Sequence, residues 1–472
     1  MKWLSALICA ACLWEATVLA QSPVTLTLEG PAYRNAIPED FSGLSFETLL
    51  EIPGTNRQYI FSGTNQPLIT LFQTLGIHSL RLGGNTADMP SFPIPGFADI
   101  DNLFAFARAV PVKVIYTLRM RNGNLATNAA IARYIKDHYQ AQLTCFAIGN
   151  EPDYYRKVYP VIKDYPAYRD AWKKDAAAIP DTLFCAPCTG GSPIWTREFA
   201  DDFAKSPLLT LITQHDYPGG SSRRVASAAA ARDQMLSPAW LAHYDKFYHA
   251  FATTAQSNGL AYRLEEASNY SEGGVKNASD TFSAALWSLD YLHWWAAHGA
   301  GGINFHGRRW VPNCVIHPVP ALEVDGSTNW TRNYNIRPIG YGIKAFDLGG
   351  HGHVQPLTLS NPDAINLTAY AVREGSNIVV TILNKSHGRA AREANVTILG
   401  NGISKDASLM LLTAPNGGVS AQSGVTLGGA SIEDDGSWHG QWTALHSTQP
   451  GTCAVKVPPA SAAIVKISAF SL

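Results

Sequence analysis

The sequence lacks an excess of charge of either sign. Its 472 residues include 36 Lys and Arg and 37 Asp and Glu, which gives a formal net charge of −1. A protein that binds nucleic acid through its phosphates usually carries a basic excess, and an unfolded chain is poor in hydrophobic residues. Because 46% of the residues here are hydrophobic, the composition predicts a folded protein with a large core and gives no indication of nucleic-acid binding.

The sequence also lacks a long hydrophobic run beyond its first twenty residues. Those residues combine the basic Lys2, an apolar stretch over 4–13 and the small-residue exit Val18-Leu19-Ala20. This pattern is typical of a secretory signal peptide that is removed after Ala20. A membrane anchor is the alternative, but Glu15 interrupts the run, which is too short to span a bilayer. We therefore expect a secreted protein, extracellular or periplasmic, that does not associate with membranes.

The sequence also has few cysteines that could form pairs. Two of the seven cysteines leave with the signal peptide, and the five that remain are Cys145, Cys185, Cys188, Cys314 and Cys453. An odd number leaves at least one thiol unpaired. The spacing of Cys185-Ala-Pro-Cys188 occurs in redox and metal sites, but no second pair accompanies it. Buried thiols or one local disulfide are the favoured interpretation.

Short apolar runs alternate with amphipathic ones through the first two thirds of the chain. The expected strands are 43–47, 78–82, 112–118, 144–148, 183–186, 209–215, 262–266 and 302–305, and the expected helices include 67–75, 100–109, 128–137, 168–178, 238–257 and 280–298. Strands that alternate with helices predict a parallel sheet, and eight such units predict a (β/α)₈ TIM barrel, here over residues 37–338. A doubly wound open sheet is the alternative, but 43–47 is not followed by a glycine-rich phosphate-binding turn.

The remainder of the chain has the pattern of a β domain. Short β-rich runs at 365–372, 378–383, 394–399, 408–413 and 462–467 are separated by Gly, Asn, Asp and Ser. They predict a C-terminal antiparallel β-sandwich over residues 339–472. The alternating Val24-Thr25-Leu26-Thr27-Leu28 predicts a strand, and we expect residues 21–36 to join that sandwich.

Two carboxylates follow strands of the expected barrel. Glu151 stands in Asn150-Glu151-Pro152 after the fourth strand, and Glu265 and Glu266 end the seventh. The carboxyl ends of barrel strands form the active-site face, and two facing carboxylates are the minimal equipment for cleaving a glycosidic bond. Because neighbouring strand side chains point to opposite faces, only one of Glu265 and Glu266 is expected in the cleft.

These segments resemble a known family. Arg81-Leu82-Gly83-Gly84-Asn85, Asn150-Glu151-Pro152, Tyr262-Arg263-Leu264-Glu265-Glu266-Ala267-Ser268-Asn269 and Gly302-Ile303-Asn304-Phe305-His306 together are similar to glycoside hydrolase family 79. That family contains secreted β-glucuronidases and heparanases with a barrel and a C-terminal β-sandwich that an N-terminal strand joins. The resemblance covers residues 24–472, and it is specific in the barrel and loose in the sandwich.

The resemblance implies a role for each matching residue. Glu151 corresponds to the acid/base and Glu266 to the nucleophile, since the family pattern Arg-x-x-Glu selects it over Glu265. Asn150 corresponds to the residue that binds the sugar 2-hydroxyl, and Tyr217 to the tyrosine that holds the nucleophile. Further substrate ligands are expected at Glu47, Asn85 and His306.

The chain departs from the family where the sugar carboxylate binds. The two tyrosines that serve there are replaced by about Ser271 and Asn313, so Tyr270 and the pair Arg308 and Arg309 are the expected substitutes. A retaining exo-β-glucuronidase without cofactor, metal or obligatory protein partner is the prediction, and its substrate is a carbohydrate or glycoside. The alternatives are a β-glycosidase for a neutral sugar and a non-catalytic carbohydrate-binding barrel. A metal site formed by His215, Asp216 and His306 was weighed and is not favoured, because their spacing fits no tight zinc motif.

Overall fold

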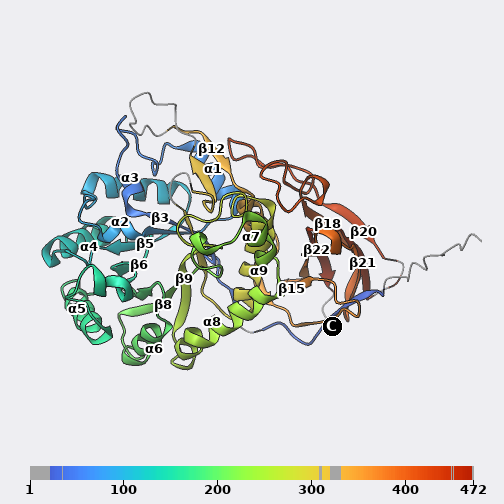
Figure 1. Cartoon of the computed structure of the whole chain (residues 1–472), viewed down its shortest axis with the longest axis horizontal. Coiled ribbons are helices and arrows are strands. Elements are labelled where there is room, and N and C mark those ends of the chain that lie inside the picture. The colour runs from blue at the N-terminus through green and yellow to red at the C-terminus, as the bar shows by residue number, and fades with distance from the viewer. Residues whose placement is uncertain are drawn as a thin grey trace, which may run out of the picture.

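The chain folds into a closed barrel and a β-sandwich, which lie side by side in the computed structural model (Figure 1). The structure describes residues 22–33, 36–307, 311–318, 331–447, 449 and 451–469. The predicted signal peptide, residues 1–20, lies outside this range. Within the described residues, no helix combines the length and apolar character needed to cross a bilayer.

Eight parallel strands close the barrel, which confirms the predicted TIM-barrel class. They are β3 (Ser42–Glu47), β4 (Ser79–Gly83), β5 (Lys113–Leu118), β6 (Leu143–Ile148), β7 (Phe184–Thr189), β8 (Leu209–Asp216), β9 (Ala261–Ala267) and β10 (Ile303–Gly307). Strand β10 pairs in parallel with β3 and so closes the ring. The open doubly wound sheet is therefore wrong. Almost every residue of these strands is buried, as expected for strands covered on both faces.

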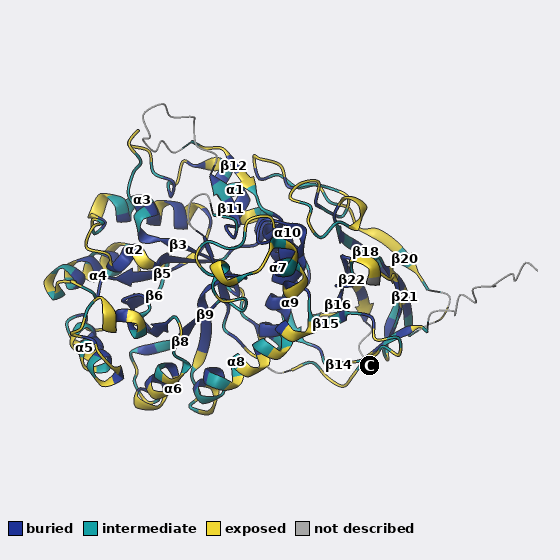
Figure 2. Cartoon of the chain, in the orientation of Figure 1, coloured by how far each residue is buried: buried dark blue, intermediate teal, exposed yellow. Residues whose placement is uncertain are grey.

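Helices surround the barrel and expose only their outer faces (Figure 2). They are α1 (Gln66–Leu75), α2 (Asn85–Asp88), α3 (Phe97–Ala109), α4 (Leu125–Tyr139), α5 (Tyr165–Ala177), α6 (Pro193–Asp202), α7 (Ala228–Met235), α8 (Pro238–Ser257), α9 (Phe282–Ala297) and α10 (Pro338–Asp347), with short 3₁₀ turns η1 (Thr48–Glu51), η2 (Pro152–Lys157) and η3 (Ser222–Arg224). Nearly all of α9 is buried. A helix that is apolar on every side must be covered on every side, and α9 lies between the barrel and the second domain.

The sandwich consists of two sheets around their own core. One sheet has the order β14 (Leu357–Ser360), β1 (Val24–Leu28), β17 (Ala394–Leu399) and β21 (Thr452–Val457); the other runs β19 (Thr426–Leu427), β18 (Ile403–Thr413), β22 (Ser461–Ala469), β16 (Asn377–Asn384), β15 (Leu367–Glu374), β13 (Gly352–Val354) and β2 (Ala36–Ile37), with β20 (Thr443–His446) beside β18. The turns η4 (Gly388–Ala390) and η5 (Pro415–Gly417) and the hairpin of β11 (Ile316–Pro318) with β12 (Tyr334–Ile336) complete the described elements.

The N-terminal segment contributes a strand to each sheet of the sandwich. Strand β1 lies between β14 and β17, antiparallel to the first and parallel to the second. Strand β2 pairs with β13 at the edge of the other sheet. The β1–β17 pair departs from a purely antiparallel sandwich, because β1 enters from the far end of the chain and no hairpin fixes its direction.

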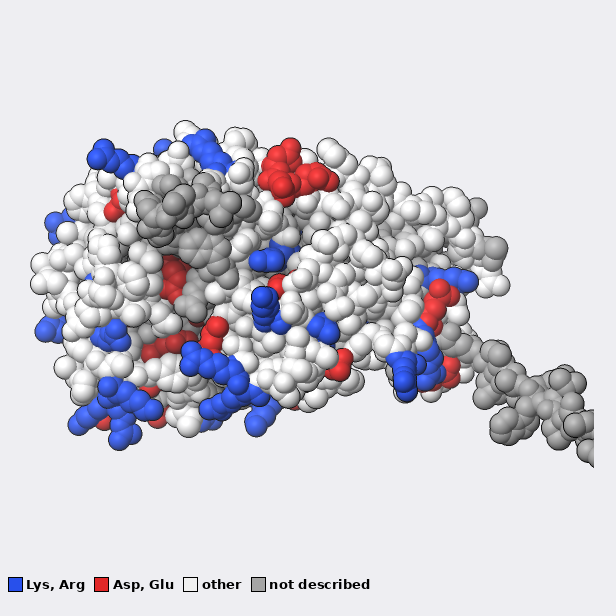
Figure 3. All heavy atoms as spheres, turned by 45° about the horizontal axis from the view of Figure 1, so that its top comes forward, with Lys and Arg blue, Asp and Glu red and all other residues white. Residues whose placement is uncertain are grey.

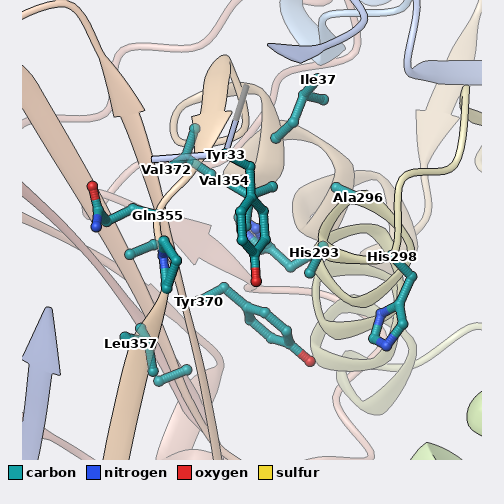
Figure 4. A pocket seen from close by; sticks show the side chains of 14 residues that line it. Tyr33, Ile37, His293, Ala296, His298, Val354, Gln355, Leu357, Tyr370 and Val372 are labelled. Atoms are coloured by element: carbon teal, nitrogen blue, oxygen red, sulfur yellow. The ribbon is translucent and has the colours of Figure 1, made fainter. Parts of the chain in front are cut away.

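The junction between the two domains differs from the expectation in two ways. The expected boundary at 338/339 falls at the start of α10, a helix that packs against α9 and belongs to the barrel. The apolar core of the barrel also continues into the sandwich, where Val372, Leu383 and Met410 are part of the same cluster. A cavity of about 300 Å³ lies at this junction and is lined by His293 of α9, Tyr370 of β15 and Tyr33 (Figure 4).

Candidate active site

The expected catalytic residues converge at the carboxyl ends of the barrel strands. Glu151 follows β6, Glu266 lies near the end of β9, and Tyr217 follows β8. Their side chains line one pocket of about 680 Å³, which also contains Glu47, Asn85 and His306. Acidic side chains are visible inside a hollow of the barrel domain, and basic side chains lie beside it (Figure 3).

Glu266 is held by four hydrogen-bonding or charged neighbours, of which His215 Nδ1 lies 3.8 Å from its Oε1. Arg81 Nη1 lies 2.5 Å from its Oε2, the Tyr217 hydroxyl donates to its Oε1 at 2.7 Å, and His306 Nδ1 lies 3.7 Å away. Burial alone would raise the pKa of this carboxyl. The surrounding positive charges, led by His306 and followed by His215, instead lower the pKa of Glu266 well below its ordinary value. Glu266 is therefore ionised, as a nucleophilic carboxylate must be.

Glu151 faces Glu266 and is more accessible. Its side chain is 19% exposed and its Oε1 accepts a hydrogen bond from His215 Nδ1 at 3.1 Å. The backbone of Glu151 has a φ of 50°, a left-handed conformation that is uncommon outside glycine and is often found at functional sites. Gly190 is also required here, because a Cβ at this position would lie 2.5 Å from Glu151 Oε1.

The two carboxylates are close enough to act on one sugar. One oxygen of each, together with a ring nitrogen of His215, all lie within 4.8 Å of one another. Retaining glycosidases hold their carboxyl groups about 5–5.5 Å apart, whereas inverting enzymes separate them by about 6.5–9.5 Å to admit a water molecule. The nearest oxygens of Glu151 and Glu266 are thus closer together than the separation typical of inverting enzymes.

Two further expected residues lie at the site: Glu47 lines the pocket, and Asn150 is buried next to Glu151 without lining it. Asn150 accepts a hydrogen bond from Arg81 Nη2 at 2.8 Å, and its backbone N–H donates to Asp88 at 2.7 Å. Glu47 accepts from both the backbone N–H and the hydroxyl of Thr86 at 2.8 Å. Burial raises the pKa of Glu47, and the hydrogen bond and charge of His306 outweigh it, so the pKa is lowered.

Arg81 is the residue of this site that the sequence analysis quoted without assigning a role. Its fully buried guanidinium contacts Ser45, Glu266 and Asn150, and so links three strands of the barrel. The available signal was a charged residue in the middle of the apolar strand β4, since a fully buried charge must be paired. Tyr154, Arg223 and Arg224 also line the pocket and were missed, because they lie in loops without a recognisable motif.

The structure corrects the expected role of Tyr270. Its side chain is fully buried, and its hydroxyl donates to the backbone carbonyl of Ala231 at 3.0 Å and to Gln234 at 3.1 Å. Tyr270 thus points toward α7 and not into the pocket, because the loop after β9 folds back on that helix. Ser271 and Asn313, which replace the two family tyrosines, do line the pocket. Arg308 and Arg309 lie outside the described residues.

Of the two adjacent glutamates only Glu266 lines the pocket, as expected, but Glu265 does not point to the opposite face of the strand. Thr213 pairs with Arg263 and His215 with Glu266, so β9 advances one residue more than β8 over this stretch. The same extra residue appears against β10. This β-bulge turns both glutamates toward the inside of the barrel. Glu266 reaches the pocket, while Glu265 is fully buried against Cys185 and His215.

The metal set that the sequence raised does not come together. His215 and His306 both approach Glu266, but Asp216 accepts hydrogen bonds from Tyr291 at 2.6 Å and His243 at 3.3 Å. These two partners belong to α9 and α8, so the Asp216 carboxylate, although it lines the pocket, is engaged by the surrounding helices and does not join the two histidines. All five described cysteines are free thiols, and each is buried.

Comparison with known proteins places the chain among glycoside hydrolases. Residues 364–464 match the family model for the glycosyl hydrolase family 79 C-terminal beta domain. No curated protein matches the chain in sequence. The structure is similar to that of a 4-O-α-L-rhamnosyl-β-D-glucuronidase from Fusarium oxysporum 12S, with a TM-score of 0.73 and 17% identity over 94% of this chain and 100% of that one.

A second solved structure with the same architecture is the family 51 arabinofuranosidase from Xanthomonas axonopodis pv. citri. Its TM-score is 0.68 at 14% identity, over 94% of this chain and 100% of the other. At these identities the likeness of the structures establishes the fold. The matched domain confirms the resemblance to family 79 that the barrel motifs indicate.

Proposed function

We propose that this glycoside hydrolase, whose C-terminal domain is of the family 79 type, is a secreted, retaining exo-β-glucuronidase. The observation that carries the proposal is the pair Glu151 and Glu266, with oxygens within 4.8 Å at the floor of one pocket. Such a pair fits double displacement at an anomeric carbon. We further propose that the substrate is a terminal β-D-glucuronide, and a neutral β-glycoside is the alternative substrate.

In the first half of the reaction Glu266 attacks the anomeric carbon. Its carboxylate is already ionised and is oriented by Tyr217 and Arg81, so no proton has to be removed before attack. Glu151 donates a proton to the leaving oxygen as the glycosidic bond breaks, and the sugar becomes an ester of Glu266.

In the second half water takes the place of the departed aglycone. Glu151, now a carboxylate, removes a proton from this water, which attacks the anomeric carbon and releases Glu266. The product has the same anomeric configuration as the substrate. Water can reach Glu151, because that carboxyl is the more exposed of the two.

The remaining pocket residues suit the binding of a single terminal sugar. We assign the 2-hydroxyl next to the reacting carbon to Asn150, which directly precedes Glu151 and is fixed by Arg81, since such bonds strengthen in the transition state. Glu47, Asn85 and His306 supply acceptors and donors for the other hydroxyls. Their acceptor-rich chemistry fits a polyhydroxylated ring better than an apolar ligand.

Two observations support a uronic acid over a neutral sugar. The matched C-terminal domain is that of family 79, and Arg223 and Arg224 bring positive charge to the pocket wall. Arginine pairs well with carboxylates. Arg223 already lies 3.1 Å from Glu272, so part of that charge is neutralised. The replacement of the family tyrosines by Ser271 and Asn313 is the observation that favours a neutral sugar.

The test is a panel of 4-nitrophenyl β-glycosides that differ only in the sugar. Preferential cleavage of the glucuronide supports the proposal. Preferential cleavage of the glucoside or another neutral glycoside overturns the proposed specificity for glucuronides. Proton NMR of the first product formed distinguishes retention from inversion. For secretion, the mature protein recovered outside the cytoplasm should begin at Gln21, and a retained N-terminus would contradict the proposal.

A further inference from the structure

Glu265 is a buried carboxylate beside the catalytic pair. The bulge in β9 directs it into the barrel, where Cys185 Sγ lies 3.6 Å from its Oε2 and His215 Nε2 lies 3.6 Å from its Oε1. Neither that oxygen nor that nitrogen has another hydrogen-bond partner among the described residues. Each is therefore the natural partner of the other, since a buried polar atom without a partner is costly.

His215 connects this carboxylate to the acid/base. Its Nδ1 lies 3.1 Å from Glu151 Oε1, on the opposite side of the ring from Glu265. The imidazole thus bridges a carboxylate inside the barrel and one that faces the substrate. An imidazole that donates from both nitrogens carries a positive charge, and a carboxylate on either side stabilises that form.

Glu265 contributes a negative charge to the buried cluster around His215. Burial alone would raise the pKa of Glu265, but His215 and Arg81 lower it to about 2, so it is ionised. Burial alone would lower the pKa of His215. The carboxylates around it, Glu266 first, raise that pKa to about 10. Two cations, Arg81 and His215, then face two anions, Glu265 and Glu266, and Glu151 is free to cycle between its two forms.

We propose that Glu265 is a positioning residue that acts through His215: it holds the ring charged and oriented so that Nδ1 donates to Glu151 throughout the reaction. The inference rests on the proposed acid/base role of Glu151. When Glu151 gives its proton to the leaving oxygen, it becomes a carboxylate and the imidazolium stabilises it. When water attacks, Glu151 takes up a proton again, and the same hydrogen bond keeps it in place.

This role predicts which substrates depend on Glu265. Protonation by Glu151 matters most for a poor leaving group and little for one that departs as a stable anion. In Glu265→Gln, kcat/KM for an aryl β-glucuronide with a poor phenol leaving group should fall about 10- to 100-fold. For the 2,4-dinitrophenyl glucuronide, kcat/KM should fall less than about threefold. If the panel selects another sugar, the same pair of aglycones is used on that sugar.

The pH dependence supplies a readout that a merely structural role would not move. Glu151, Glu265, Glu266 and Arg81 are the charged groups that face His215. With Glu265 neutral, the imidazolium loses one of its counter-charges and gives up its proton at lower pH. The pH at which His215 loses its proton should therefore be lower in Glu265→Gln than in the wild type, and Glu265→Asp should restore part of the shift.

The charge on His215 can be read without any substrate. In the wild type, nitrogen NMR of this imidazole should show both ring nitrogens protonated at pH 7, and in Glu265→Gln the neutral ring should appear. This measurement separates the present inference from the proposed function, because it does not depend on which sugar is cleaved. Cys185→Ala is the matched control: it removes a contact of Glu265 that does not involve His215 and should leave the NMR signature and the leaving-group pattern unchanged.

Two results would overturn the inference. The first is a neutral His215 in the folded wild type at pH 7. The second is a Glu265→Gln protein that loses activity equally on both leaving groups and in which His215 titrates as in the wild type, since that pattern indicates a general loss of structure. If Glu265→Gln does not fold, the wild-type NMR measurement and Glu265→Asp still decide the question.

Discussion

Two buried histidines of the same barrel have opposite properties. His215, at the mouth, and His293, on α9 at the junction with the sandwich, are both almost fully buried. Burial opposes the charge of both, yet the pKa of His215 is raised to about 10 and that of His293 is lowered to about 3. Their neighbours make the difference, because His215 faces three carboxylates and His293 lies flat against Tyr370, with ring centroids 5.2 Å apart.

The junction has a carboxylate of its own, but that carboxylate is fully engaged by other partners. Asp290 accepts from Thr368 and Tyr370 through one oxygen, and Lys385 binds the other at 2.7 Å. Nothing is left for His293, whose ring stays neutral beside the cavity of Figure 4. The mouth instead has charged groups that face a pocket. At the junction the charged groups bind one another and join the two domains. At the mouth they face the pocket and are available for reaction.

Removing Glu266 should have the largest effect on the reaction. We expect Glu266→Ala to lower kcat by about 10⁴-fold or more, because nucleophile loss in covalent catalysis has effects of this size. Sodium azide should restore part of the turnover by filling the vacant space, with a glycosyl azide of inverted configuration as the product. Rates are measured on the best substrate of the panel. Full activity in Glu266→Ala, or azide rescue of Glu265→Ala instead, would show that the nucleophile is misassigned.

Breaking the ion pair between Asp290 and Lys385 at the junction should lower the stability of the protein and leave its activity unchanged. Lys385→Met leaves Asp290 ionised and buried without its cation, which typically costs about 3–5 kcal/mol of unfolding free energy. The double variant Asp290→Asn with Lys385→Met removes both charges and should recover most of this loss. Denaturant unfolding gives the stabilities, and kcat at low temperature should stay near the wild-type value. A loss of kcat without a loss of stability would contradict the contrast between the two regions.

The strands and the placement of Glu151 and Glu266 in one pocket could be predicted from the sequence, because each depends on local pattern. Apolar runs define the barrel strands, and Glu151 and Glu266 are polar residues placed directly at strand ends. The inward turn of Glu265 could not be predicted, since it depends on how β9 aligns with β8 and β10. The orientation of Tyr270 could not be predicted either, because it depends on a contact with α7. Helix α10 was not expected, because it is short and β-rich segments follow it in the sequence.

The two histidines should also destabilise the protein at opposite ends of the pH range. In the unfolded chain a histidine titrates near 6.5. His293 stays neutral in the folded state down to about pH 3, so its contribution is present above pH 6.5 and is lost as the pH falls. His215 stays charged up to about pH 10, so its contribution is present below pH 6.5 and is lost as the pH rises.

The variant that isolates one side of this comparison is His293→Phe. Its stability relative to the wild type should rise between pH 6.5 and 4, by up to about 1.4 kcal/mol per pH unit. Above pH 7 the two stability curves should run parallel, because His215 is intact in both proteins. Urea unfolding across the pH range provides the measurement. A difference that is constant with pH would mean that His293 does not remain neutral in the folded state.

Tyr270 gives the smallest expected effect and tests where the mouth ends. Its hydroxyl donates to Ala231 and Gln234, so Tyr270→Phe removes hydrogen bonds to α7 and should cost about 1 kcal/mol of stability. The ratio of kcat/KM for the glucuronide to that for the glucoside should not change, since the side chain does not line the pocket. Comparison of both substrates on the wild type and the variant checks this. A fall in that ratio would mean that Tyr270 reaches the sugar carboxylate, and the boundary between reactive and structural side chains would then lie further out along the loop after β9.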